Sequence, residues 1–249
     1  MTFPDETGTL PGEPPAEAPP LPPLGPPAPP RGVVGRELGV VLLILVPSLV
    51  ISLFALRTAV MGFTTLAVGT IFQDLSLVAL VAYFFWRNGE GVAALGWRGP
   101  LFQEAVIGAV LFVPTYFAAG GLEGLLSHGG LSAPAHLPSF LKATGPGETV
   151  LAAVLVLVVG FAEETIFRGY LLRRFAQATS STFAAVLLSA VVFSLGHGYE
   201  GTAGMAAVGF LGLVFALVYL WRGSLVAPMV MHMLQDMIGL VVVPLLLGK

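Results

Sequence analysis

The chain of 249 residues contains no cysteine, and charged residues are scarce in it. The absence of cysteine excludes disulfide bonds, thiolate metal sites and a cysteine nucleophile. Asp, Glu, Lys and Arg together make up only 10% of the residues, whereas soluble domains carry about 25%. A surface with so little charge cannot mostly face water. The chain also lacks a long basic patch, so nucleic acid is not expected as a partner.

Long apolar runs occupy most of the chain. Hydrophobic residues make up 56% of it, and the mean hydropathy is +0.90. A helix needs about 20 apolar residues to cross the hydrocarbon core of a bilayer. The predicted fold class is therefore all-α, a polytopic integral membrane bundle of about seven transmembrane helices. The predicted spans are 38–56, 64–86, 105–122, one that begins within 149–162, 175–196, 201–221 and 224–247.

The composition divides the chain into three parts. Residues 1–35 are rich in proline, which donates no backbone hydrogen bond and fixes φ, so we expect a disordered, solvated tail. A proline-rich ligand for a partner protein is the alternative, and the features of a signal peptide are missing. Residues 36–146 hold the first three spans and an interfacial segment, and residues 147–249 form the candidate catalytic core.

The basic residues orient the bundle in the membrane. Seven arginines fall on the side of the N-terminus and three basic residues on the other, and basic loops favour the cytoplasm. We therefore predict an integral protein of the cell membrane with a cytoplasmic N-terminus, surrounded by the lipid bilayer. The first set is Arg31, Arg36, Arg87, Arg98, Arg173, Arg174 and Arg222, and the second is Arg57, Lys142 and Lys249.

Three polar clusters interrupt the apolar helices of the C-terminal part. A charge in the bilayer costs about 2.5–3.5 kcal/mol even on lenient insertion scales, so each cluster indicates a functional site. The first cluster is Glu163, Glu164 and Arg168, the second is Phe193 and His197, and the third is His232 and Asp236.

The spacing of the first two clusters predicts that they meet. Glu163 precedes the polar turn at 179–181 by about as many residues as separate that turn from His197. At about 1.5 Å per residue, both lie roughly 24–26 Å from the turn and therefore at one depth. His232 follows the turn at residues 222–223 by only about nine residues. It reaches the depth of Glu163 and His197 only if the two hairpins are offset or the fourth helix projects beyond the bilayer. The second option suits Arg173 and Arg174, which we expect in water.

Two pairs of these residues are four apart and therefore share a helix face. One pair is His232 and Asp236. In the other, Arg168 is expected to hold Glu164 and to leave Glu163 free, although an ion pair of purely structural importance is an equal alternative. His197 alone would be read as a loop histidine at the membrane edge. Asp74, isolated in the second span, is expected to make a polar contact between helices, with a role in substrate entry as the alternative.

Together the three clusters resemble the motifs of the CPBP family of intramembrane proteases, also called the ABI family, which includes the type II CAAX prenyl proteases. The pattern E-E-x-x-x-R is present as Glu163, Glu164 and Arg168. The pattern F-x-x-x-H is present as Phe193 and His197, and H-x-x-x-N/D as His232 and Asp236. The resemblance covers roughly residues 147–240.

The resemblance implies hydrolysis of peptide bonds in a membrane-associated peptide or protein substrate. Glu163, assisted by His197, would activate water, and His232 with Asp236 would stabilise the oxyanion. Glu164 belongs to the catalytic motif, with Arg168 and Phe193 as structural support. An aspartate at 236 departs from the asparagine form, because an ionised carboxylate cannot donate a hydrogen bond. Asp236 is therefore expected to orient His232 or to be kept protonated.

The cofactor requirement is open at this stage. Glu163, His197 and His232 form the kind of three-ligand set that catalytic zinc uses, but the soluble zinc-protease motif H-E-x-x-H is absent. A metal-free glutamate mechanism is the alternative. Two other functions remain as well: a proton-coupled transporter, which also buries acids in its spans, and a non-catalytic scaffold or immunity-type protein.

Overall fold

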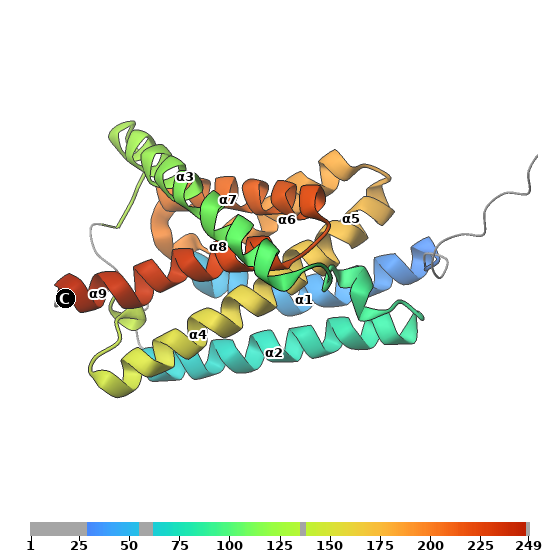
Figure 1. Ribbon diagram of the computed structural model, residues 1–249, viewed down its shortest axis with the longest axis horizontal. Coiled ribbons are helices and arrows are strands. Elements are labelled where there is room, and N and C mark those ends of the chain that lie inside the picture. Colours follow the sequence, from blue (N-terminus) through green and yellow to red (C-terminus); the bar gives the residue numbers. More distant parts are fainter. Residues whose placement is uncertain (1–28, 55–61, 135–137, 248–249) are drawn as a thin grey trace, which may run out of the picture.

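The computed structural model describes residues 29–54, 62–134 and 138–247, and all regular structure in these ranges is helical. The predicted all-α bundle is confirmed (Figure 1). Within the described ranges, six helices are long and apolar enough to cross a membrane, and α6 is a shorter apolar helix. The α-helices are α1 (Arg31–Phe54), α2 (Phe63–Arg87), α3 (Leu101–His128), α4 (Pro146–Glu164), α5 (Leu172–Thr179), α6 (Thr182–Leu195), α7 (Gly201–Arg222), α8 (Val226–Met237) and α9 (Val243–Leu247).

The proline-rich tail lies almost entirely outside the described residues. The first helix begins at Arg31, so the last few residues of the predicted tail are already helical. Short 3₁₀ turns η2 (Val92–Leu95), η3 (Ser139–Leu141) and η5 (Gly198–Glu200) lie in the connections between helices.

The fourth membrane helix is continuous over 34 residues, from Pro146 to Thr179. Its middle part, η4 (Thr165–Leu171), is π-helical and entirely buried. At about 1.5 Å per residue this helix is much longer than the roughly 30 Å of a bilayer core. The helix is thus long enough to project beyond the bilayer, which is one of the two arrangements that the depth of His232 allowed.

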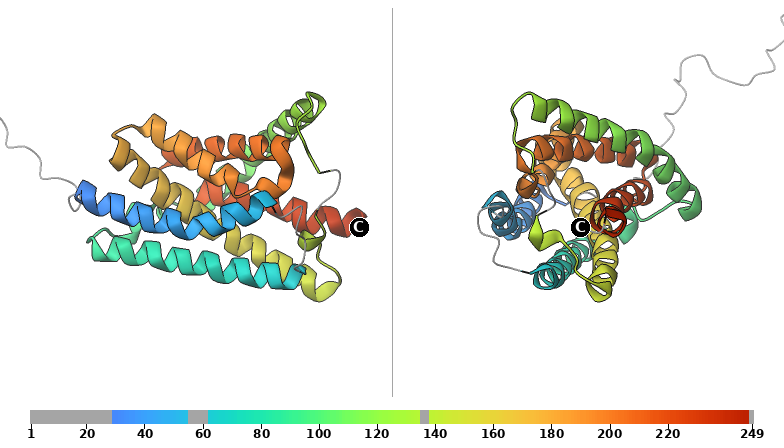
Figure 2. Two further views of the ribbon diagram at one scale, coloured as in Figure 1. Left: turned by 180° about the vertical axis from the view of Figure 1, so that it is seen from behind. Right: turned by 90° about the vertical axis from the view of Figure 1, so that its left-hand side faces the viewer.

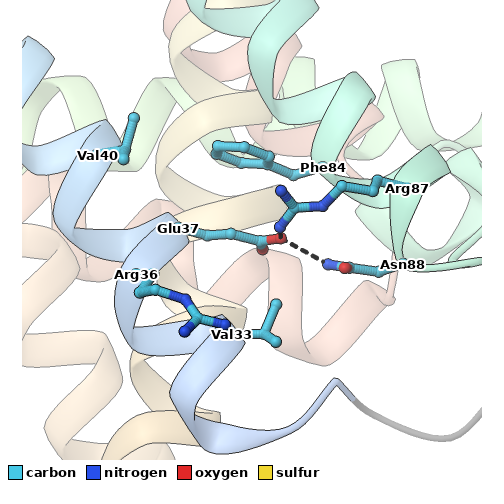
Figure 3. A pocket seen from close by; sticks show the side chains of 7 residues that line it. All are labelled: Val33, Arg36, Glu37, Val40, Phe84, Arg87 and Asn88. Atoms are coloured by element: carbon cyan, nitrogen blue, oxygen red, sulfur yellow. Dashed lines mark hydrogen bonds and ion pairs between the residues drawn. The ribbon is translucent and has the colours of Figure 1, made fainter.

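A buried ion network joins the N-terminal end of α1 to α2 and α5. Glu37 accepts hydrogen bonds from Arg87 at 2.6 Å and from Asn88 at 2.9 Å, beside a pocket of about 370 Å³ (Figure 3). Arg174 is completely buried and pairs with Glu90 at 2.5 Å. Our expectation that Arg174 lies in water is therefore wrong, because two buried carboxylates surround it: Glu37 also lies 3.5 Å from its guanidinium.

The turn between α5 and α6 shifts the start of the fifth predicted span. Ser180 adopts a left-handed conformation with φ of 57°, and the Ser181 side chain accepts a hydrogen bond from the Ala184 amide. A left-handed residue and an N-cap end one helix and begin the next. The predicted start at residue 175 is therefore wrong: Phe175 belongs to α5, and α6 begins at Thr182.

Glycines let α8 approach α3 and α4 closely. A Cβ atom at Gly108 of α3 would lie 2.5 Å from the carbonyl oxygen of Ala227, and one at Gly160 of α4 would lie 2.5 Å from Met233 Cγ. The right-hand view of Figure 2 shows α8, in red, between α3, in green, and α4, in yellow. This close packing brings His232 beside Glu163 and Glu164 of α4, so α8 positions the site.

Candidate active site

Glu164 and Arg168 form a buried ion pair, as the sequence predicted. The atoms Arg168 Nη1 and Glu164 Oε1 lie 2.7 Å apart, and both side chains are fully buried. The guanidinium also donates to the carbonyl oxygen of Gly212 on α7 and lies 4.4 Å from the ring centroid of Phe193 on α6. Arg168 thus ties the fourth membrane helix to α6 and α7 behind the site.

His232 connects the third cluster to the first. Its Nδ1 lies 2.9 Å from Glu164 Oε1, and because an ionised carboxylate only accepts, Nδ1 is the donor. Its Nε2 lies 3.8 Å from Glu163 Oε2 and 3.5 Å from Asp236 Oδ2. The edge of Phe193 packs on the imidazole at 5.7 Å between ring centroids. The imidazole is therefore fixed, with Nε2 directed toward Glu163 and Asp236.

Glu163 and Asp236 remain accessible where Glu164 is not. Their side chains are 20% and 24% exposed, whereas Glu164 is fully buried. The atom Glu163 Oε2 has no hydrogen-bond donor within the described part of the chain. Neighbouring glutamates on one helix thus face different surroundings: Glu164 binds Arg168 and His232, and Glu163 faces a cavity.

His197 lines the same cavity as Glu163. Its Nδ1 lies 3.0 Å from the carbonyl oxygen of Phe193, and its ring packs between Phe193 and Tyr199. Across the residues described, no hydrogen bond or ion pair joins His197 to Glu163. The partner of Glu163 is instead His232, which the spacing argument had placed least well.

The cavity has a volume of about 940 Å³ and extends from the acids of α4 toward the end of the bundle where α3 ends. Residues from α1, α2, α3, α4, α6, α7 and α8 line it. Sequence reasoning did not assign Gln73, Tyr199, Glu200 or Glu123 to a site, and it treated Asp74 chiefly as a packing contact. The only signal for Asp74 was its charge in an apolar span, because contacts between distant spans cannot be read from spacing.

The proposed zinc ligands do not form a metal-binding group here. In the ranges that the structure covers, no group of three or more His, Asp or Glu side chains is placed to hold a metal ion. Glu163 and His232 approach each other, but His197 directs Nδ1 to a backbone carbonyl. The arrangement therefore does not fit the set of Glu163, His197 and His232 that the sequence allowed.

A comparison with known families gives one match. Residues 145–238 match the family described as type II CAAX prenyl endopeptidase Rce1-like. The matched segment runs from the start of α4 into the end of α8, so it contains all three clusters and covers less than half of the chain. Neither a curated protein nor a solved structure matches the chain.

Proposed function

We propose that this protein is an intramembrane endopeptidase that hydrolyses peptide bonds of membrane-associated substrates. The match of residues 145–238 to the Rce1-like family of CAAX-type proteases supports this. The observation that carries this proposal is the contact of Glu163 and Asp236 with one His232 nitrogen at the wall of a large cavity. A carboxylate and an imidazole beside a cavity are the groups that peptide hydrolysis needs.

Glu163 acts as the general base. Its accessible carboxylate takes a proton from water while the water oxygen attacks the carbonyl carbon of the scissile bond. Support comes from its partly exposed side chain and from its place on the cavity wall. The same proton then passes to the leaving amine as the C–N bond breaks, so that Glu163 returns to its starting state.

His232 stabilises the oxyanion of the tetrahedral intermediate. As an imidazolium it donates one N–H to Glu164 and presents the other, at Nε2, toward the cavity side of Glu163. A donor held in place before the reaction stabilises developing charge without reorganisation. Asp236 orients this imidazole from the next helical turn, at 3.5 Å.

His197 assists from its place on the cavity wall. It lines the cavity with Glu163, and its Nδ1 is oriented by the Phe193 carbonyl, which leaves Nε2 for water or substrate. We derive no step through a metal ion, because the side chains do not form a ligand set.

The orientation follows from the arginine distribution. We place the protein in the cell membrane with Arg31 and the ion network of Glu37 on the cytoplasmic side. The cavity extends toward the opposite end of the bundle, where α3 ends and α4 begins. Substrates that enter there reach the site from the non-cytoplasmic half of the membrane.

The purified protein in lipid vesicles, incubated with a set of membrane-spanning peptides in ¹⁸O-labelled water, tests the function. Mass spectrometry is expected to find pairs of fragments that together make up the peptide plus one water, with ¹⁸O in the new carboxyl group. A scaffold or a transporter would give intact peptides and no labelled fragment.

A further inference from the structure

Carboxylates dominate the charged lining of the cavity. Its acidic lining residues are Asp74, Glu123, Glu163, Glu200 and Asp236, and no Lys or Arg lines it in the described part of the chain. Like charges in a low-dielectric cavity repel one another strongly unless a cation or protons compensate them. The lining therefore favours a ligand that carries positive charge.

Asp74 gives an independent indication of such a ligand. This residue of α2 is only 7% exposed and lines the cavity, and its Oδ2 has no hydrogen-bond donor in the described ranges. It lines this cavity together with Glu163 and His232. More than 90% of buried polar groups are hydrogen-bonded. The unbonded oxygen of Asp74 is thus an acceptor within reach of a donor that enters the cavity beside Glu163.

Other elements add further acidic side chains to the cavity. Glu200, in η5, lines it together with Glu123 on α3 and Asp236 on α8. Neither Glu123 nor Glu200 has a part in the proposed hydrolysis, and both belong to elements other than α4. The acidic lining therefore continues along the cavity, from Asp74 beside the site to the end of α3.

Apolar side chains form much of the remaining wall. Leu45, Leu77, Phe167 and Leu211 are among the buried residues that line the cavity. Such a lining suits a peptide ligand that has apolar residues on either side of one charged side chain.

We propose that the cavity binds an apolar peptide segment with a basic side chain, whose guanidinium or ammonium group is bound by Asp74, with Glu123 and Glu200 attracting it. The proposal rests on the proposed function in that it names this segment as the substrate. Binding itself requires no hydrolysis, and this allows the two to be tested separately.

The test compares two fluorescent Leu/Ala peptides that differ only in a central Arg or its uncharged analogue citrulline. Affinities are measured for the full chain in lipid nanodiscs, with Glu163→Gln to stop hydrolysis. We expect the Arg peptide to bind about tenfold more tightly, as one charge-assisted hydrogen bond would give. This preference should disappear with the added substitution Asp74→Asn and weaken with Glu123→Gln.

The control is Glu148→Gln, because Glu148 is held by Thr64 and Thr144 and lies outside the residues that line the cavity. This variant should keep the full preference. Equal affinities for the two peptides, or a preference that survives both Asp74→Asn and Glu123→Gln, would overturn the proposal. If Asp74→Asn does not fold, the double variant Glu123→Gln/Glu200→Gln takes its place, since both residues lie outside α4. An unchanged preference for the Arg peptide in that variant would overturn the proposal.

Cleavage of the same peptides by the wild-type protein separates this inference from the proposed function. An Arg preference in binding without any cleavage would support the cation site and contradict the protease. Cleavage of both peptides with equal kcat/KM and equal affinity would support the protease function and contradict the cation site.

Discussion

At the scale of single residues, two adjacent glutamates have different tasks because a helix turns by about 100° per residue. Glu164 is buried between Arg168 and His232, while Glu163 faces the cavity. The sequence predicted the pair of Glu164 and Arg168 and the pair of His232 and Asp236, since both are four residues apart on one helix. It could not predict the bond between His232 and Glu164, because that contact depends on how α8 packs on α4.

Removing the positive charge behind the site should destabilise the protein. In Arg168→Met, Glu164 loses its buried partner, and breaking such a pair costs about 3–5 kcal/mol. Thermal unfolding in detergent should show a clearly lower midpoint than for Arg31→Met, a change at an exposed arginine. Equal midpoints for the two variants would mean that the pair contributes nothing to stability.

Replacing His197 should reduce activity without unfolding the protein. His197→Ala removes a group that assists proton transfer, which contributes about 100-fold or more to catalysis. His128→Ala is a matched control, because His128 makes the same contact from Nδ1 to the carbonyl four residues earlier, at 2.7 Å, but is exposed. Initial cleavage rates of both variants provide the measurement, and similar rates would assign His197 to structure alone.

At the scale of helices, glycines decide where α8 can lie. The sequence indicated small residues for close packing but did not show which helix each one faces. The turn at Ser180 was also unpredictable in detail, because the apolar pattern continues from α5 into α6 while the backbone reverses through a single left-handed residue. The π-helical part of the fourth helix left no pattern that spacing could reveal.

The contact between α3 and α8 gives a prediction at this scale. In Gly108→Ala the new methyl group would lie 2.5 Å from the backbone oxygen of Ala227, so α8 must shift. Overpacking of this kind costs about 1–3 kcal/mol, and displacement of His232 should lower cleavage too. Gly124→Ala on the same helix meets nothing within 4 Å and should match the wild type in both assays. A Gly108→Ala protein as stable and active as Gly124→Ala would contradict this packing.

At the scale of the whole molecule, composition alone predicted the membrane class and the helical bundle. A chain with few charges and long apolar runs can bury its apolar surface only in a membrane. The membrane class and the helical bundle could therefore be predicted without knowing how the helices pack. The cavity could not be predicted, because its walls come from seven helices that are far apart in the sequence. Asp74 in particular lies outside the segment that matches the Rce1-like family.

The orientation of the bundle can be measured with single cysteines, since the chain has none of its own. Gly91 follows the end of α2 and Gly147 lies in the first turn of α4. These two helix ends are at opposite ends of the bundle (Figure 1), and a Cβ atom at either position meets nothing within 4 Å. On intact cells, a membrane-impermeant maleimide should label Gly147→Cys and should label Gly91→Cys only after the cells are opened. The reverse pattern would place the mouth of the cavity on the cytoplasmic side.

Glu163 is proposed to activate water for peptide hydrolysis, and the cleavage rate of Glu163→Gln in lipid vesicles tests this directly. The amide keeps the shape of the side chain but cannot accept the proton from water, so we expect the rate to fall by about 100-fold or more. Glu148→Gln, which changes a glutamate at the start of the same helix, should cleave like the wild type. Cleavage by Glu163→Gln at the wild-type rate would contradict the role of Glu163 as the general base.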